Sequence, residues 1–152
     1  MTEKEVKSIL LKKLQFSQDC LYKLDKFCSE VIEYNKKFNL ISKSTEPQIW
    51  DRHVLDSAQL VKYIDFKDGS SLSDLGTGAG FPGIILAIFN KNIKFHVKLY
   101  EKSRVKTKFL KEICSKLNIK ADIYENDYRS HDINSDYVIS RAFKKLEEHL
   151  RI

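Results

Sequence analysis

A glycine-rich stretch between a predicted strand and a predicted helix constrains this chain most. The sequence reads DLGTGAGFPG from Asp74 to Gly83, after an apolar run that predicts a strand at 72–75 and before one that predicts a helix at about 82–90. Glycines let the backbone turn sharply and approach a ligand without a Cβ in the way. In a parallel α/β sheet such a turn lies at the carboxyl edge, where ligands bind. The stretch therefore predicts a ligand-binding α/β domain.

The chemistry of this turn favours a cationic ligand over a dinucleotide. A dinucleotide fingerprint that starts at Gly76 and Gly78 needs a third glycine at position 81, where this chain has Phe81. Asp74, two residues before Gly76, would also repel a pyrophosphate. S-adenosylmethionine has an ammonium, a sulfonium and no phosphate, and it fits the turn better.

Acids that follow the next two predicted strands extend this hypothesis. Glu101 comes at the end of the strand predicted at 95–100, where a carboxylate can accept two hydrogen bonds from ribose hydroxyls. Asp127 follows the strand predicted at 121–125, where an acid or amide often meets the adenine amino group. A capped turn or a solvated acid would explain any one of these residues alone. Together, and in this order, they predict a site for S-adenosylmethionine.

The chain changes character at the polar segment 68–71, Asp68-Gly69-Ser70-Ser71. Hydrophobic periodicity predicts helices at 3–14, 18–38, from Thr45 onwards, 82–90, 103–117 and from about 143, and strands at 72–75, 95–100, 121–125 and 137–140. Thr45-Glu46-Pro47-Gln48 resembles a capping box. Alternating strands and helices predict an α/β fold with a parallel, doubly wound sheet. We expect residues 1–68 to be an N-terminal helical extension packed on an S-adenosylmethionine-binding core at 69–152.

Composition narrows the class of protein further. No run approaches the roughly 20 apolar residues that span a bilayer, and the three cysteines form no CxxC or Cys/His cluster, so we expect a cytoplasmic protein without a metal site or a membrane partner. The net charge is +6, and residues 91–120 hold ten basic side chains against two acidic ones. This concentration favours a polyanionic partner, although a lysine-rich solvated helix face would look the same.

The residues around the glycine turn resemble those of the RsmG (GidB) family, the bacterial 16S rRNA guanine-N7 methyltransferases. The match runs from about residue 20 to 146 in register. It consists of Tyr34-Asn35, Phe38-Asn39-Leu40, Arg52-His53-Val54-Leu55-Asp56-Ser57, the turn from Asp74 to Ile84, Glu101, Lys106, Phe109-Leu110 and Asp136-Tyr137-Val138-Ile139-Ser140-Arg141-Ala142-Phe143. GTGAGFPG, RHxLDS and SRAF are specific in combination, whereas many methyltransferases share the glycine turn alone.

The resemblance implies the Rossmann-like fold of class I S-adenosylmethionine-dependent methyltransferases and methyl transfer to N7 of a guanosine in 16S rRNA, guanosine 527 in the conventional numbering. It implies cofactor contacts from Gly76, Gly78, Phe81, Glu101, Asp127, Tyr128 and Arg141, and a catalytic role for Ser140 and Arg141. After the third strand the family usually has Arg-x-Glu, whereas this chain reads Glu125-Asn126-Asp127-Tyr128-Arg129. The adenine contact therefore stays open among residues 126–128.

The implied reaction needs no general base, because guanine N7 is an unprotonated lone pair, and alignment with exclusion of water suffices. Arg141 would donate to guanine O6 and Phe143 would stack on the base, against the alternatives of a surface ion pair and a core residue. At helical spacing we expect His53 to be a packed histidine rather than a base. Its neighbours Arg52 and Asp56 would form an ion pair or contact RNA.

Two further hypotheses compete with that of an rRNA methyltransferase. The chain could be a small-molecule methyltransferase, or a truncated remnant that binds cofactor or RNA without turnover. The basic segment 91–120 and the SRAF match argue against a small-molecule methyltransferase. Within that segment, Arg104, Lys108 and Lys111 are expected to form a face for the phosphates of 16S rRNA in the small ribosomal subunit. The class usually has seven strands and only four are predicted here, so the C-terminal strands are expected to be missing. The fourth strand would then be an exposed edge that favours self-association.

Overall fold

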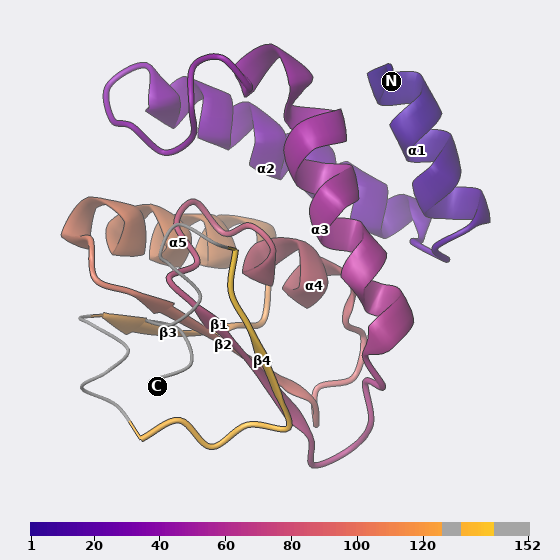
Figure 1. Ribbon diagram of the computed structural model, residues 1–152, viewed down its shortest axis with the longest axis vertical. Helices are drawn as coiled ribbons and strands as arrows, with labels where there is room; N and C mark the ends of the chain where they lie inside the picture. The colour runs from indigo at the N-terminus through magenta and orange to yellow at the C-terminus, as the bar shows by residue number, and fades with distance from the viewer. Residues whose placement is uncertain (126–131, 142–152) are drawn as a thin grey trace.

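The computed structural model describes residues 1–125 and 132–141. The helix predicted from about 143 and the candidate residues Asp127 and Tyr128 lie outside this part of the chain. Four parallel strands form one sheet in the order β3-β2-β1-β4, with β1 at Ser71–Leu75, β2 at His96–Glu101, β3 at Asp122–Glu125 and β4 at Tyr137–Ile139 (Figure 1). The predicted α/β fold with a parallel sheet is confirmed.

The register of the strands gathers their carboxyl ends at one edge. Leu75, the last residue of β1, pairs with Tyr100, so Glu101 at the end of β2 lies one position beyond it. On the other side of β1, Asp74 pairs with Ile139 at the end of β4. The glycine turn after β1 therefore lies between the residues that end β2 and those that follow β4.

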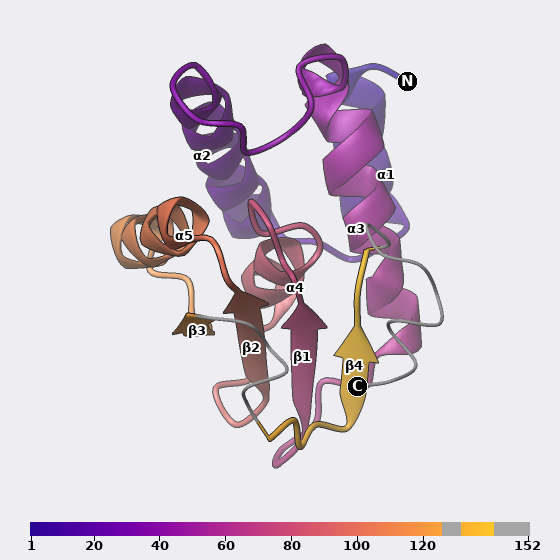
Figure 2. The same cartoon turned by 60° about the vertical axis from the view of Figure 1, so that its left-hand side comes forward.

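Helices cover one face of the sheet. Figure 2 shows α4 (Gly83–Phe89) and α5 (Arg104–Leu117) against this face, with α1 (Glu3–Lys12) and α2 (Gln18–Asn35) in a further layer. Ser17 caps α2, and its side chain accepts a hydrogen bond from the backbone N–H of Cys20. Ser103 caps α5 in the same way through Lys106. None of the helices built from residues 1–125 and 132–141 is both long and apolar enough to cross a bilayer.

One continuous hydrophobic core joins the N-terminal helices to the sheet. The ring of Phe27 on α2 lies 5.3 Å from that of Phe81 after the glycine turn and 6.3 Å from that of Phe109 on α5. The fully buried side chains of this core include Val6, Leu10, Leu24, Val31, Val54, Leu72, Ile84, Leu99 and Leu110. Because burial of an apolar side chain contributes roughly 1.5–3 kcal/mol, the first 68 residues and the sheet stabilise each other.

The opposite face of the sheet carries a much smaller cluster. Leu75 and Tyr100 are buried there, with Tyr124 and Ile133 packed against them. The rings of Tyr100 and Tyr124 stack at 4.8 Å. Alternation along the strands explains the division, because Val97 and Leu99 face the helices while Tyr100 faces the other side.

The third helical segment differs from its prediction. It consists of a 3₁₀ turn at Glu46–Gln48, a π-helical segment at Trp50–Leu55, the short α3 at Asp56–Ala58 and a 3₁₀ turn at Gln59–Tyr63. The predicted capping box at Thr45 is wrong, since the Thr45 side chain makes no capping hydrogen bond. Its hydroxyl instead donates to the carbonyl of Ser42 and lies 2.8 Å from Nε2 of His53. Single-turn π segments occur frequently at functional sites.

Candidate functional site

The glycine turn begins where β1 ends and is anchored on β2. The backbone N–H groups of Gly76 and Thr77 both donate to the carbonyl of Tyr100, at 2.8 and 3.0 Å. Gly76 and Gly78 adopt left-handed φ angles of 69° and 63°, a region that L side chains disfavour. The glycines are therefore required by the backbone path, as the sequence pattern indicated.

Asp74 holds the two ends of this turn together. Its Oδ2 accepts hydrogen bonds from the Thr77 hydroxyl at 2.7 Å and from the Gly83 N–H at 2.8 Å. The side chain is fully buried, and this burial raises the pKa of the carboxyl to about 6. Its Oδ1 has no hydrogen-bond partner within the described residues. The sequence suggested Asp74 as an acid suited to a cationic ligand, and this stays a prediction; in the structure its buried side chain shapes the turn from within.

Glu101 ties the same turn to the start of α5. Its Oε1 accepts a hydrogen bond from the Gly78 N–H at 2.9 Å, and its Oε2 accepts one from the Ser103 N–H at 2.8 Å. The residue is 7% exposed. Each carboxylate oxygen has a second lone pair, so Glu101 can accept hydrogen bonds from ligand hydroxyls without releasing the backbone.

Space around the glycines separates those that serve packing from those that leave room for a ligand. A Cβ on Gly83 would lie 2.2 Å from Cδ2 of Leu99, and one on Gly80 would lie 2.4 Å from Cγ1 of Ile84. A Cβ on Gly78 would meet nothing within 4 Å. Gly78 thus presents bare backbone at an open face beside Glu101, and this arrangement fits a nucleoside whose ribose hydroxyls meet that carboxylate.

Phe81, a candidate cofactor contact, lies mainly in the core. It is 4% exposed, and its ring lies 5.3 Å from that of Phe27 and 5.0 Å from that of His53. The side chain therefore supports the glycine turn from the helix side. Its expected contact with the cofactor stays a prediction.

The residues after β4 reach the glycine turn through Ser140. Its hydroxyl donates to the carbonyl of Leu75, the residue before Gly76, at 3.2 Å. Arg141 follows directly, with Nη1 at 3.2 Å from Nδ1 of His53 and Nη2 at 3.8 Å from Oδ2 of Asp56. The structure thus brings the two candidate catalytic residues to the edge that carries the glycine turn.

His53 is the site-associated residue that the sequence left with a purely structural role. It is packed, as predicted, but it also contacts Arg141, 88 positions away in the chain. Burial, and next the charge of Arg141, lower the pKa of His53 to about 4. Of the two alternatives for Arg52 and Asp56, the ion pair between them does not form, since Asp56 contacts Arg141 instead, and RNA contact stays a prediction. RHxLDS and SRAF were visible as motifs, but nothing in their spacing indicated that they meet.

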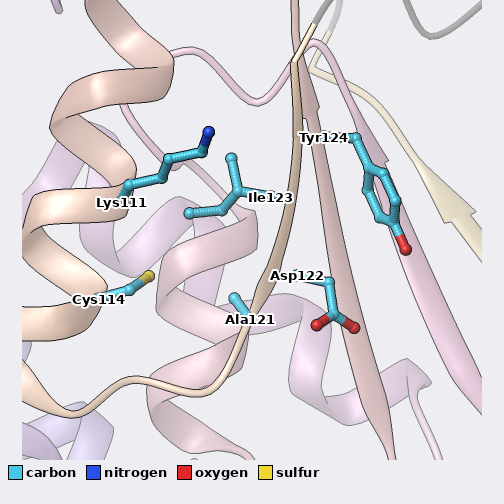
Figure 3. Close-up of a pocket in the computed structure, with 6 residues that line it drawn as sticks. All are labelled: Lys111, Cys114, Ala121, Asp122, Ile123 and Tyr124. Atoms are coloured by element: carbon cyan, nitrogen blue, oxygen red, sulfur yellow. The ribbon is translucent and has the colours of Figure 1, made fainter.

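The basic face of α5 lies at the other end of the site, near β3. Arg104 and Lys111 approach Glu125 at 3.5 and 3.8 Å. A shallow hollow between α5 and β3 is lined by Lys111, Cys114, Ala121, Asp122, Ile123 and Tyr124 (Figure 3). Lys111 and Cys114 point from α5 towards Ile123, whereas Asp122 and Tyr124 lie on the other side of the strand. Within the described residues, no group of three or more His, Cys, Asp or Glu side chains could hold a metal.

Comparison with solved structures defines the class of fold. A protein-L-isoaspartate O-methyltransferase matches with a TM-score of 0.57 and 13% identity over 91% of this chain and 47% of that one. A structure described as MtNAS in complex with MTA and tNA matches with a TM-score of 0.51 and 15% identity over 99% and 60% of the two chains. The chain therefore has the Rossmann-like fold of class I S-adenosylmethionine-dependent methyltransferases.

Sequence comparison specifies the family within this class. A family model described as rRNA small subunit methyltransferase G (GidB) matches residues 20–152. The ribosomal RNA small subunit methyltransferase G of Pelagibacter ubique is 37% identical over 142 residues, which cover 90% of this chain and 66% of the relative. That of Magnetococcus marinus is 40% identical over 132 residues, or 83% and 58% of the two chains. The chain belongs to the rRNA small subunit methyltransferase G family and spans less than two thirds of the length of these relatives.

Proposed function

We propose that this protein transfers the methyl group of S-adenosylmethionine to N7 of a guanosine in 16S rRNA, guanosine 527 in the conventional numbering. The observation that carries the proposal is the hydrogen bond from Ser140 to the carbonyl of Leu75. It brings Arg141, a candidate to hold the acceptor base, beside the turn proposed to hold the methyl donor. Membership of the rRNA small subunit methyltransferase G family supports the class of substrate.

Gly76, Gly78 and Glu101 would hold the cofactor. The open face of Gly78 gives the nucleoside room, and the free lone pairs of Glu101 would accept hydrogen bonds from the ribose hydroxyls. Asp127 and Tyr128, which follow β3, remain our candidates for the adenine. The buried Oδ1 of Asp74 adds negative charge beneath the turn, and this charge suits a cationic ligand and disfavours a pyrophosphate.

When bound, S-adenosylmethionine supplies a methyl group activated by its sulfonium. The N7–carbon bond would form as the carbon–sulfur bond breaks, with S-adenosylhomocysteine as the leaving group and no proton transferred. Arg141 would orient the guanine by donating to O6, and Ser140 would fix Arg141 relative to the turn. The depressed pKa of His53 and its contact with Arg141 agree with a reaction that needs no general base.

The small ribosomal subunit is the proposed partner. Arg104, Lys108 and Lys111 on α5 would contact rRNA phosphates, and Arg104 and Lys111 would exchange Glu125 for phosphate. β4 is an outer strand of the described sheet, and Val138 on it is half exposed. Self-association through β4 is a subsidiary proposal that sedimentation of the purified chain tests.

The decisive experiment incubates the chain with radiolabelled S-adenosylmethionine and small subunits that lack this methyl group. Cleavage of the rRNA at 7-methylguanosine then locates the product. We expect one modified guanosine, and loss of at least a hundredfold in rate for Arg141→Ala, with Lys62→Ala on the exposed side of the third helical segment as the charge-matched control. Cofactor binding without transfer would favour a non-catalytic remnant. Transfer to a small metabolite alone would overturn the rRNA assignment.

A further inference from the structure

A run of side-chain hydrogen bonds connects the N-terminal helical segment to Arg141. Nη1 of Arg141 lies 3.2 Å from Nδ1 of His53, and Nε2 of the same ring lies 2.8 Å from the Thr45 hydroxyl. The Thr45 hydroxyl in turn lies 3.0 Å from the carbonyl oxygen of Ser42. These groups come from residues 42–53 and from Arg141, the second residue after β4, so only the folded chain brings them together.

The chemistry of these groups fixes the direction of every hydrogen bond in the run. A hydroxyl has one hydrogen, and that of Thr45 is donated to the carbonyl of Ser42. Thr45 must therefore accept from His53, so the ring carries its proton on Nε2. Nδ1 then has a free lone pair, and it accepts the N–H of Arg141. The tautomer of a histidine is set in this way by the partner of its other nitrogen.

The surroundings hold His53 in place. Its ring packs against Phe81 at 5.0 Å, and its backbone carbonyl accepts a hydrogen bond from the Ser57 hydroxyl at 2.6 Å. The charged groups that act on it are Arg141, Arg52 and Asp56. A proton on Nδ1 would place two cations in contact, and the low pKa of His53, about 4, agrees with a ring that is neutral at physiological pH.

Asn35 fixes the loop that carries Thr45. Its Oδ1 accepts hydrogen bonds from the backbone N–H groups of Leu40 and Ile41 at 2.9 and 3.2 Å. Its Nδ2 donates to Oε2 of Glu46, the residue after Thr45, at 2.6 Å. The buried Asn35 thus ties the middle and the end of this loop to the end of α2. The Thr45 hydroxyl is held by the fold and is not a freely rotating surface group.

We propose that His53 is a positioning residue for Arg141: as the neutral tautomer protonated on Nε2, set by Thr45, it accepts one guanidinium N–H and directs the remaining donors towards the acceptor base. The role at the base rests on the proposed function, whereas the hydrogen-bond run does not. Asp56 is a weaker anchor, since its Oδ2 lies 3.8 Å from Arg141 and its side chain is 64% exposed.

Substitutions that separate hydrogen bonding from packing test the catalytic part. An asparagine at 53 can present its carbonyl oxygen near the place of Nδ1, whereas leucine fills similar volume without an acceptor. We expect His53→Leu to lower single-turnover methylation of small subunits tenfold to a hundredfold, with the KM for S-adenosylmethionine changed less than about threefold. His53→Asn should recover most of the rate. Thr45→Val should lose roughly threefold to tenfold, and Thr45→Ser should match the parent.

Two outcomes of these assays would overturn the proposal. One is a His53→Leu rate equal to that of the parent. The other is a His53→Asn rate as low as that of His53→Leu although both variants unfold at the parent temperature, because packing would then be the whole effect. Thermal unfolding of each variant followed by circular dichroism supplies this control.

A second measurement needs no activity. Nitrogen-15 NMR of the imidazole should show His53 neutral and protonated on Nε2 at pH 7, and Arg141→Ala should raise the titration midpoint of His53 because a nearby positive charge is removed. A ring protonated on Nδ1, or a midpoint unchanged in Arg141→Ala, would overturn the hydrogen-bond run. If the NMR result holds and the unmodified chain transfers no methyl group to rRNA, the proposed function fails while the contact of His53 with Arg141 stands.

Discussion

The two halves of the candidate site are held by different kinds of contact. In the glycine-turn half, Asp74 and Glu101 are buried carboxylates that accept hydrogen bonds from the backbone of the turn or from residues close by. In the other half, Arg141 is 38% exposed at its side chain and is held by His53, 88 positions away. The first half is built from β1, its turn and α4 together with the adjacent end of β2. The second exists only when the N-terminal segment packs on the sheet.

The largest effect that we expect distinguishes two glycines within the first half. Gly83→Ala should lower the free energy of unfolding by about 4 kcal/mol, because its Cβ would overlap Leu99 and lie 2.7 Å from Oδ2 of Asp74, which would displace a buried hydrogen-bonded carboxylate. Gly78→Ala should cost only about 1–2 kcal/mol, the strain of its left-handed backbone, because no atom opposes its Cβ. Urea denaturation measures both.

Gly78→Ala, the less destabilised of the two variants, should be the one that loses affinity for the ligand while it stays folded. A methyl group on Gly78 would stand at the open face of the turn, so folded Gly78→Ala should bind S-adenosylhomocysteine at least tenfold more weakly by calorimetry. Unchanged affinity in that variant would show that the nucleoside does not lie against Gly78. Equal loss of stability in the two variants would contradict the division between packing glycines and ligand-facing glycines.

The glycine-turn half was predictable because it depends on strand and turn patterns that are local in sequence and on the regular register of parallel strands. The alternation of Phe95, Val97 and Leu99 along the chain identified β2, and the glycines after β1 identified a sharp turn, in which the structure shows left-handed φ angles. Glu101 is the last residue of β2, so the parallel register places it beside the turn. Strand and helix positions in this region agree with the structure to within one or two residues.

The remote half was not predictable because its hydrogen bonds depend on tertiary packing. The sequence around Thr45 is typical of a helix cap, yet its hydroxyl donates to the carbonyl of Ser42 and hydrogen-bonds to Nε2 of His53. Helical periodicity indicated that His53 is buried but not which group would meet its Nδ1. Only the placement of β4 beside β1 brings Arg141 within reach.

The two halves should also respond to pH with opposite signs. The folded state binds the Asp74 proton more tightly than the unfolded chain. The free energy of unfolding therefore includes a contribution from this proton that is present below about pH 4 and is lost as pH rises through about 6. The folded state binds the His53 proton less tightly than the unfolded chain. The contribution of neutral His53 to the free energy of unfolding is therefore present above about pH 6.5 and is lost as pH falls through about 4. Each contributes about 3 kcal/mol, and the two slopes oppose each other in the parent.

Substituting either Asp74 or His53 should reveal how the other residue alone makes the free energy of unfolding depend on pH. Between pH 4 and 6.5, the stability of Asp74→Asn should rise with pH relative to the parent, and that of His53→Asn should fall. Urea denaturation at half-unit steps of pH measures the differences, in which unrelated titrating groups cancel. Parallel curves for the two variants would show that the two halves do not carry opposed protonation.

A smaller loss of stability is expected on substitution of Glu101, whose carboxylate accepts two backbone hydrogen bonds. In Glu101→Gln the amide nitrogen would face the N–H of either Gly78 or Ser103, so the variant should lose about 2 kcal/mol of stability and bind S-adenosylhomocysteine roughly tenfold more weakly. Glu112→Gln on the exposed side of α5 is the matched control and should change neither. Tight binding by Glu101→Gln would remove this carboxylate from the proposed ribose site.

The smallest effect concerns the second partner of Arg141. Asp56→Asn removes a charge that lies 3.8 Å from the guanidinium, but both side chains are more than a third exposed, so the free energy of unfolding should change by less than about 0.5 kcal/mol. The change should shrink further in 0.5 M salt, because exposed ion pairs are screened. The methylation rate should stay within about threefold of the parent, since His53 still accepts the Nη1 hydrogen bond. A loss as large as that of His53→Leu would instead make Asp56 the principal anchor, and the neutral contact that distinguishes this half of the site would then be secondary to an ion pair.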